Sequence, residues 1–320
     1  MTKPKILAVA GPTASGKSAL AVRLAELSRG VIVSCDSMQI YRRMDVGTAK
    51  PTEDEQKLVE HRMIDVVEPD VDFSCADYVR MASREVSDII NCGRLPIFCG
   101  GTGLYLDAFL RGSDFAETDI DDNLRRELRE VAEKHGNEAL HAELKRIDPE
   151  SAAQIHPNNV KRVIRAIEIY RTSGKTKSEI DRLSQQCESE YDALVIALRY
   201  NDRALLYKRI DDRVDAMIEE GLVEETRRLY NEGIFEINST ASQAIGYKEM
   251  LGYIKGECSL EAALEQLKGA TRRYAKRQMT WFSSKSYVRW IDADRDGKMR
   301  GFDEIVNDAF SLMREEGFQI

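Results

Sequence analysis

Residues 11–18 read Gly-Pro-Thr-Ala-Ser-Gly-Lys-Ser, and this segment constrains the fold more than any other part of the chain. A short apolar run, 6–10, precedes it, and leucines at helical spacing follow it within 19–27. A glycine-rich segment between a strand and a helix fits the phosphate-loop template, in which backbone N–H groups and a helix N-terminus surround an anion. We predict that Lys17 reaches a terminal phosphate and that the Ser18 hydroxyl ligates Mg²⁺. The predicted diphosphate-binding residues are Gly11, Pro12, Thr13, Ala14, Ser15, Gly16, Lys17 and Ser18.

Strand-like and helix-like segments alternate along the first hundred residues. Continuous apolar runs, typical of buried parallel strands, occur at 31–33, 95–99 and 192–200, and we expect further strands at 63–67 and 288–291. Ser74 is expected to cap a helix that runs to about Cys92, and Asn201 to cap a long amphipathic helix. Repeated strand–helix units predict an α/β fold with a doubly wound parallel sheet.

The pattern changes near Asp114, where an acidic stretch gives way to helical charge patterning. From there to about Glu190 no segment has a convincing strand pattern. We therefore predict a helical insertion domain at 118–190 within an α/β catalytic core formed by 1–117 and 191–320.

Composition excludes several classes of protein. The 320 residues are 42% hydrophobic and 32% charged, as in ordinary globular proteins. A net charge of −8 excludes a uniformly basic nucleic-acid coat protein but allows a basic groove on an acidic body. With no apolar run of membrane-spanning length and no signal-peptide pattern, we expect a cytoplasmic protein without a membrane partner. The six scattered cysteines predict reduced thiols, and the four histidines lack zinc-site spacing.

The phosphate loop does not identify its ligand, because a nucleoside triphosphate and a prenyl diphosphate offer it the same diphosphate. Asp36 follows the predicted strand at 31–33, and the carboxyl ends of parallel strands form the ligand crevice of such sheets. We predict that Asp36 faces the site, where it binds Mg²⁺ through water or acts as a general base. Gly100-Gly101-Thr102-Gly103 follows another strand; its glycines would permit close approach of a ligand, and Thr102 can hydrogen-bond a phosphate or a nucleotide.

Two basic segments stand out against the acidic total. The first, in the predicted insertion, contains Lys161, Arg162, Arg165, Arg171, Lys175 and Lys177, with only Glu168 opposing them. The second, 269–289, contains Arg272, Arg273, Lys276, Arg277, Lys285 and Arg289, interleaved with Tyr274, Trp281, Phe282 and Tyr287. Cations for phosphates and aromatics for stacking favour a structured RNA as partner, although each segment alone also suits a solvated helix face. Arg213, after the strand at 192–200, is a candidate cation for a leaving diphosphate.

Taken in order, these motifs closely resemble those of the bacterial-type tRNA dimethylallyltransferase (tRNA isopentenyltransferase) family. The matching segments are Gly-Pro-Thr-Ala-Ser-Gly-Lys-Ser at 11–18, Asp-Ser-Met-Gln-Ile-Tyr at 36–41, Asp-Val-Gly-Thr-Ala-Lys-Pro at 45–51, Gly-Gly-Thr-Gly-Leu-Tyr at 100–105, Lys-Arg-Val-Ile-Arg-Ala-Ile-Glu at 161–168, Ala-Ile-Gly-Tyr-Lys-Glu at 244–249 and Lys-Arg-Gln-Met-Thr-Trp-Phe at 276–282. The resemblance spans nearly the whole chain. It implies a P-loop NTPase-like core and transfer of a dimethylallyl group from dimethylallyl diphosphate to N6 of the adenine 3′ of the tRNA anticodon. It also implies release of diphosphate, Mg²⁺ as cofactor and a base flipped out of its loop.

The resemblance further implies roles for individual residues. Lys17, Ser18 and Arg213 act with Mg²⁺ on the leaving diphosphate, and Asp36 takes or holds a proton of the amino group. The implied tRNA contacts are Asp36, Ser37, Met38, Gln39, Thr102, Arg125, Lys161, Arg162, Val163, Ile164 and Arg165. Ser18 stands where many relatives have threonine, which keeps the hydroxyl. Lys161 stands where many have glutamine, which keeps a donor.

Three alternatives stay open at this level. A small-molecule kinase shares the phosphate cradle but needs no basic insertion, and an adenylate isopentenyltransferase would modify free AMP. An RNA-binding regulator with an inactive phosphate loop is the non-enzymatic alternative, against which Lys17, Ser18 and Asp36 argue. For the favoured reading we expect a monomer whose partners are the tRNA anticodon stem-loop and dimethylallyl diphosphate.

Overall fold

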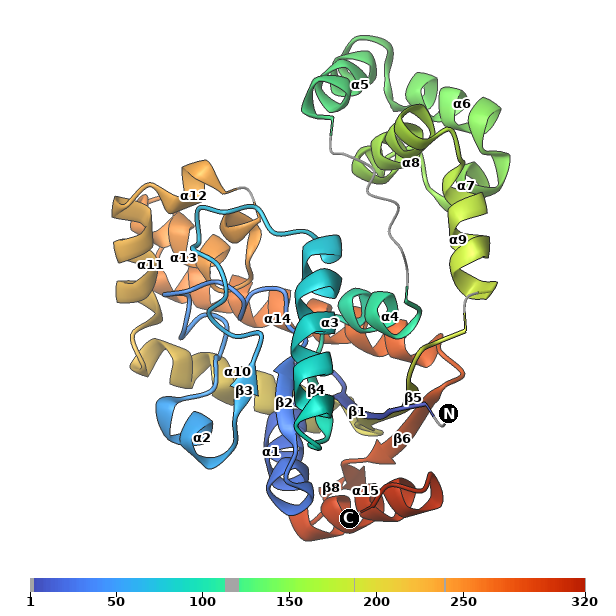
Figure 1. Cartoon of the computed structure of the whole chain (residues 1–320). Helices are drawn as coiled ribbons and strands as arrows, with labels where there is room; N and C mark the ends of the chain where they lie inside the picture. The colour runs from blue at the N-terminus through green and yellow to red at the C-terminus, as the bar shows by residue number, and fades with distance from the viewer. Residues whose placement is uncertain (1–2, 113–120, 187, 239, 320) are drawn as a thin grey trace. The chain divides into compact units, whose positions relative to one another are not determined.

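The computed structural model describes residues 3–112, 121–186, 188–238 and 240–319. The chain divides into two compact units, one formed by Met1–Phe109 with Tyr191–Ile320 and the other by Leu110–Glu190 (Figure 1). Two separate stretches of chain build the first unit, so the second unit is inserted into it. The boundary predicted at 118 falls outside the described residues.

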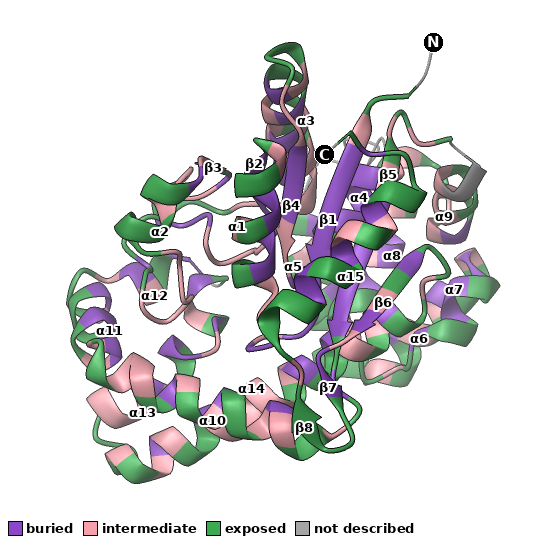
Figure 2. Cartoon of the chain, turned by 90° about the horizontal axis from the view of Figure 1, so that it is seen from below, coloured by how far each residue is buried: buried purple, intermediate pink, exposed green. Residues whose placement is uncertain are grey.

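The first unit is built on a six-stranded sheet in the order β3-β2-β4-β1-β5-β6, whose neighbouring strands all run parallel. Its strands are β1 (Lys5–Ala10), β2 (Val31–Ser34), β3 (His61–Arg62), β4 (Pro96–Gly100), β5 (Asp192–Arg199) and β6 (Val288–Asp292). β1 and β5 are buried along nearly their whole length (Figure 2). A strand covered on both faces needs apolar side chains on both sides, which explains the continuous apolar runs. The predicted α/β fold with a doubly wound parallel sheet is confirmed.

Helices of the first unit cover both faces of this sheet. In chain order its helices are α1 (Lys17–Ser28), α2 (Glu53–Leu58), α3 (Cys75–Asn91), α4 (Gly103–Leu110), α10 (Arg203–Glu219), α11 (Leu222–Asn231), α12 (Ile234–Ile237), the 3₁₀ turn η1 (Ala241–Gln243), α13 (Tyr247–Ile254), α14 (Leu260–Ser283) and α15 (Phe302–Glu315). α1 and α15 pack with Leu7 and Ile97 on one face. On the opposite face, the ring centroids of Phe98 in β4 and Phe109 in α4 are 4.6 Å apart.

A second apolar cluster of this unit joins α10, α11, α13 and α14 to the loop after β2. Ile40 and Met44 of that loop are fully buried against Leu222, Leu229 and neighbouring side chains. The cluster therefore holds residues 38–50 in a fixed path beside the carboxyl edge of the sheet.

Among its described residues, the second unit contains helices and connecting loops but no strand. It consists of α5 (Asp122–His135), α6 (Asn137–Ile147), α7 (Pro149–Gln154), α8 (Val160–Ser173) and α9 (Lys177–Gln186). Its core is a cluster from α5, α6 and α8 in which Leu128, Leu140 and Ile167 are fully buried. This agrees with the predicted absence of strands from the insertion.

Two local predictions are wrong. The strand expected at 63–67 does not form, because Met63 and Asp65 have φ of +61° and +55°, which an extended strand excludes. The edge strand is β3, two residues earlier. Asn201 is not the cap of α10: the Asp202 side chain accepts from the Ala204 N–H, while the Asn201 N–H donates to Asp294 Oδ1 at 2.7 Å. In contrast, Ser74 caps α3 as predicted.

The described cysteines, 35, 75, 92, 99 and 258, are unpaired, and Cys187 lies outside the described residues. Within the described part of the chain, the helices fall short of the combined length and hydropathy needed to cross a bilayer.

Candidate active site

The phosphate loop joins β1 to α1 through backbone conformations that few residues adopt. Gly11 and Gly16 have φ of +137° and +94°, and Ala14 between them has φ of +60°. A Cβ on Gly11 would lie 3.0 Å from the carbonyl oxygen of Leu198, so this position requires glycine. Residues 14–18 line a hollow of about 290 Å³ together with two arginines of α10, and Thr13 lines the adjacent cavities. The eight predicted residues thus form one anion-sized cradle, with Gly11 and Pro12 shaping its turn.

Lys17 and Arg213 bring two cations to this cradle. Among the described residues, neither has a carboxylate oxygen within the 4.0 Å of a salt bridge. Burial lowers the pKa of Lys17, and the nearby Arg213 charge lowers it further, against the opposing effects of Cys99 and Asp36. Burial also lowers the pKa of Arg213. Positive charge is therefore costly here, and a bound anion would stabilise both side chains.

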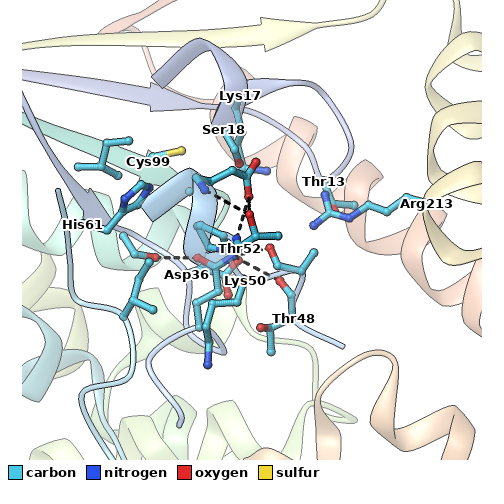
Figure 3. A pocket seen from close by; sticks show the side chains of 18 of the residues that line it. Thr13, Lys17, Ser18, Asp36, Thr48, Lys50, Thr52, His61, Cys99 and Arg213 are labelled. Carbon is cyan, nitrogen blue, oxygen red and sulfur yellow. Dashed lines mark hydrogen bonds between the residues drawn. The ribbon is translucent and has the colours of Figure 1, made fainter. Parts of the chain in front are cut away.

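Two cavities meet beside Asp36. One of about 600 Å³ extends from the phosphate loop toward α2, and one of about 280 Å³ lies against α10, α14 and residues 243–246. The residues that line both are Thr13, Asp36, Thr48, Arg213, Met217 and Tyr274. Figure 3 shows Lys17, Ser18, Asp36 and Arg213 around the larger cavity. A ligand in each cavity would therefore meet the other at the Asp36 carboxylate.

The carboxylate of Asp36 is held by its own turn. Its Oδ1 accepts the Met38 N–H at 2.9 Å. The next residue, Ser37, donates its N–H to the Thr102 hydroxyl at 3.0 Å, which ties the turn after β2 to the turn after β4. Ser37 and Met38 line the smaller cavity, as the prediction of substrate contacts requires. The Thr102 hydroxyl already accepts from the protein, so its observed role is to position the Asp36 turn.

Gln39 connects the end of β2 to the loop at residues 48–49 on one side of the larger cavity. Its Oε1 accepts from the Ser34 hydroxyl at 3.0 Å, and its Nε2 donates to the carbonyl oxygens of Thr48 and Ala49 at 3.3 and 3.1 Å. Both ends of the amide are therefore occupied by the protein. Gln39 borders the larger cavity and fixes the loop that carries Thr48.

The glycines at the end of β4 and directly after it pack closely against other parts of the fold. A Cβ on Gly100 would lie 2.1 Å from the Cys35 carbonyl oxygen, and one on Gly103 would lie 2.2 Å from the Trp281 ring. Gly101 would clash with Gln278. At Gly101 and Gly103 side chains of α14 occupy the space in which close approach of a ligand was predicted, whereas Gly100 lines the larger cavity and close approach there stays a prediction.

Sequence reasoning missed the buried polar side chains that connect distant parts of this site. Gln278 of α14 accepts the Thr13 N–H at 2.8 Å and donates to the Gly101 carbonyl at 3.0 Å. Glu225 of α11 accepts the backbone N–H groups of 45, 46 and 47 at 3.0–3.1 Å and the Tyr247 hydroxyl at 2.5 Å. The only signal for Gln278 was its place inside the matched segment 276–282, and Glu225 had none, because no pattern in the chain marks a long-range partner.

The predicted tRNA contacts of the second unit separate into three groups. Lys161 and Arg162 are exposed, and neither pairs with a carboxylate among the described residues. Arg125 and Arg165 both bind the buried carboxylate of Glu168, at 2.8 and 2.7 Å. The predicted contacts through Val163 and Ile164 are wrong for their side chains, which lie in the core of the unit and cannot reach a ligand.

The charge of both basic segments is partly neutralised. In the first segment, more carboxylates than Glu168 oppose the cations, since Arg171 binds Glu143 at 2.6 Å and Lys177 binds Asp181. In the second, Arg272 binds Asp211, and Phe282 is buried in the fold. Three cations of α14 remain exposed without a described carboxylate partner, namely Arg273, Lys276 and Arg277. Arg277 and Tyr274 line the smaller cavity, so this part of the basic segment does reach the site.

A phosphate loop after the first strand of a parallel α/β sheet, facing two cations and a carboxylate over paired cavities, defines a P-loop enzyme for a phosphorylated substrate. Residues 39–285 match the family model described as IPP transferase, and residues 4–72 match that of isopentenyl transferase. A curated tRNA dimethylallyltransferase of Geobacillus thermodenitrificans is 49% identical over 90% of this chain and 90% of its own. One from Thermoanaerobacter sp. is 46% identical over 91% and 92%. The chain therefore belongs to the tRNA dimethylallyltransferase family of transferases.

Solved structures agree with this assignment. The full-length tRNA isopentenylpyrophosphate transferase of Bacillus halodurans matches with a TM-score of 0.72 and 41% identity, covering 98% of this chain and 97% of its own. A eukaryotic dimethylallyltransferase acting on tRNA matches with a TM-score of 0.80 and 28% identity, covering 99% of this chain and 81% of its own. The predicted family and fold class are confirmed.

Proposed function

We propose that this chain transfers a dimethylallyl group from dimethylallyl diphosphate to N6 of the adenine 3′-adjacent to the anticodon of tRNA. The observation that carries the proposal is the meeting of two cavities at Asp36, one of them continuous with the phosphate loop. Such a layout suits a reaction between two substrates that enter separately. The family of the chain supports the choice of donor and acceptor.

In the proposed reaction, the bond between C1 of the dimethylallyl group and the bridging oxygen breaks, and the electron pair leaves with the diphosphate. Negative charge therefore grows where Lys17, Arg213 and the loop N–H groups lie. Donors fixed in this way stabilise the departing charge more than the ground state, which lowers the barrier.

The acceptor nitrogen forms the new bond to C1 and then loses a proton to Asp36. An adenine amino group is a weak nucleophile, so the carboxylate must lie close, and a late proton loss suits an aspartate. Tyr274 and Arg277 offer planar groups in the smaller cavity, and planar side chains stack on a base that has left its loop.

Mg²⁺ fits this site as a partner of the donor. No group of three or more His, Cys, Asp or Glu side chains among the described residues could hold a metal alone. Mg²⁺ usually binds one or two protein oxygens together with substrate phosphates. Ser18 and Asp36 both line the larger cavity and offer such oxygens. When bound, Mg²⁺ would supply further positive charge to the leaving diphosphate.

We propose that the tRNA anticodon stem-loop is bound through exposed cations, Lys161 and Arg162 in the second unit and Arg273, Lys276 and Arg277 on α14. The predicted monomeric state stays a prediction.

A transfer assay tests the proposal. The protein is incubated with Mg²⁺, radiolabelled dimethylallyl diphosphate and an anticodon stem-loop with an adenine-rich loop, or with AMP, or with ATP and small acceptors. We expect label in the stem-loop alone. Label in AMP would indicate a free-nucleotide enzyme, and consumption of ATP without prenyl transfer would indicate a kinase. RNA binding without any turnover would support a regulator.

A further inference from the structure

A second arginine lines the phosphate hollow, and it lies outside every motif considered above. Arg209 precedes Arg213 by four residues on α10, so the two side chains lie one turn apart on the same helix face. Both line the hollow of about 290 Å³ that is otherwise formed by residues 14–18. A Cβ built on Gly16 would lie 3.9 Å from Arg209 Nη2, which places the guanidinium directly over the loop.

Arg209 carries a charge that the protein leaves uncompensated. Within the described residues no carboxylate lies within 4.0 Å of it. Its neighbours on α10 differ: Lys208 binds Asp212 at 2.7 Å, and Asp211 binds Arg272 of α14. An unpaired guanidinium that lines an anion-sized hollow offers charge-assisted hydrogen bonds to an anionic ligand.

Arg209 also supports the unusual path of the loop. Its Nε donates to the carbonyl oxygen of Ala14 at 2.8 Å, and Ala14 is the loop residue with φ of +60°. The Tyr200 hydroxyl donates to the next carbonyl, that of Ser15, at 3.2 Å. With these carbonyls held on the outer side, the neighbouring N–H groups are free to turn toward an anion. Nε is thus occupied by the loop, and the guanidinium also hydrogen-bonds the Tyr200 side chain, while the group as a whole still lines the hollow in which phosphate oxygens would lie.

We propose that Arg209 binds the terminal phosphate of the donor and makes the site select a diphosphate over a monophosphate. This inference rests on the proposed function and deepens its donor site. Arg213 lines the two reaction cavities as well as the hollow, so it serves the phosphate next to the reacting carbon. Arg209 lines the hollow alone among these cavities and serves the far phosphate. A monophosphate would leave Arg209 without its ligand.

Calorimetric titration of the full chain with inorganic diphosphate, and separately with inorganic phosphate, tests the assignment in the presence of Mg²⁺. For Arg209→Ala we expect a Kd for diphosphate at least about tenfold higher, the scale of a charge-assisted hydrogen bond, with little change for phosphate. The matched control is Lys208→Ala, which removes the adjacent exposed cation and should change neither Kd by more than about twofold. Arg209→Lys keeps a cation and should give an intermediate Kd, which also covers the case of an unstable alanine variant.

Two results would overturn the proposal, and they differ in what else they affect. If Arg209→Ala and Arg209→Lys bind diphosphate as tightly as the parent chain, or lose both anions equally, Arg209 is at most a support of the loop. Tyr200→Phe, which removes hydrogen bonds to the Ser15 carbonyl and to Arg209 but removes no cation, measures how far a disturbed loop alone weakens the binding of both anions. If the parent chain binds no diphosphate at all, the proposed donor site itself fails, and the transfer assay will be negative too.

Discussion

The phosphate loop and the wall of the smaller cavity converge on Asp36, yet they are built in opposite ways. The loop is eight consecutive residues whose shape follows from glycines, from one strained alanine and from the start of α1. The wall collects side chains from the turn after β2, from α10 and from α14. It keeps its shape through a few buried polar contacts between residues far apart in the chain.

Because of this difference, the two regions should respond differently to the loss of a single side chain. The path of the loop is set by its own backbone conformations, and Arg209, Tyr200 and Gln278 add contacts from distant parts of the chain. The wall depends on Gln278 and Glu225, each of which satisfies several buried backbone groups at once. Loss of one such side chain leaves unpaired donors and acceptors behind, which costs more than the missing bond itself.

The largest effect is expected where the two regions meet. Asp36→Asn keeps an oxygen that can accept the Met38 N–H but removes the base, so kcat should fall by at least about 100-fold. RNA affinity should change little. Single-turnover transfer under saturating donor and stem-loop measures this directly. Asp54→Asn, at an exposed carboxylate of α2, is the control; near-parental rates in Asp36→Asn would remove the proposed base.

Next in size is the loss of the contact that joins loop and wall. Gln278→Leu preserves the size of the side chain but leaves the Thr13 N–H and the Gly101 carbonyl unpaired, so we expect a loss of about 1–3 kcal/mol in unfolding free energy. Donor kcat/KM should fall with it. Urea denaturation and initial rates measure both, with Gln266→Leu on the exposed side of α14 as control. Unchanged stability would show that the two regions are independent.

The phosphate loop could be predicted from the sequence, whereas the long-range contacts that support the wall of the smaller cavity could not. The loop, the strand at 5–10 and the cap at Ser74 depend on neighbouring residues, so their pattern is visible in the chain. Gln278 and Glu225 look like ordinary helical residues, because their partners are hundreds or scores of positions away. The glycines at 100–103 show the same limit: their motif is visible, but only the fold reveals that Cys35 and Trp281 fill the space beside them.

A smaller effect is expected at the other end of the wall. Burial raises the pKa of Tyr247, which donates its hydroxyl hydrogen to Glu225. Tyr247→Phe removes that donor, and Glu225 keeps only the three backbone N–H groups of 45–47 as partners. We therefore expect a loss of about 1 kcal/mol in unfolding free energy and a higher KM for the stem-loop. Tyr230→Phe is the control, since its ring, not its hydroxyl, contacts Lys255. Equal behaviour of the two variants would contradict a special role for the Glu225 contact.

The second unit also contains a buried carboxylate, Glu168, and its ionisation should make the stability of this unit depend on pH. Burial raises the pKa of Glu168, but hydrogen bonds from Arg165, Arg125 and the Asp121 N–H outweigh it, and the pKa lies below its ordinary value of 4.5. A lowered folded-state pKa stabilises the fold above the unfolded value, and that stability disappears as the pH falls through the folded value. We expect protection of α8 amides from hydrogen exchange, corrected for intrinsic rates, to fall below about pH 4.5 in the parent chain. Glu168→Gln should lower protection at pH 7 and flatten the decline; a parallel pH profile would rule out Glu168 as its source.

The smallest effect is expected on the salt dependence of RNA binding, in a comparison of an exposed arginine with one that is already paired with a buried carboxylate. Arg162 is exposed and unpaired among the described residues, whereas the Arg165 charge is already bound to Glu168. Each phosphate contact contributes about 0.7–0.9 to the slope of log affinity against log salt. Arg162→Ala plus Arg165→Ala should therefore flatten the slope by about one contact rather than two, with Arg162→Ala alone giving nearly the whole change. Filter binding of the stem-loop across a salt series measures both variants. An unchanged slope in Arg162→Ala would remove Arg162 from the RNA contacts and leave Lys161 and the exposed cations of α14 as the proposed ones.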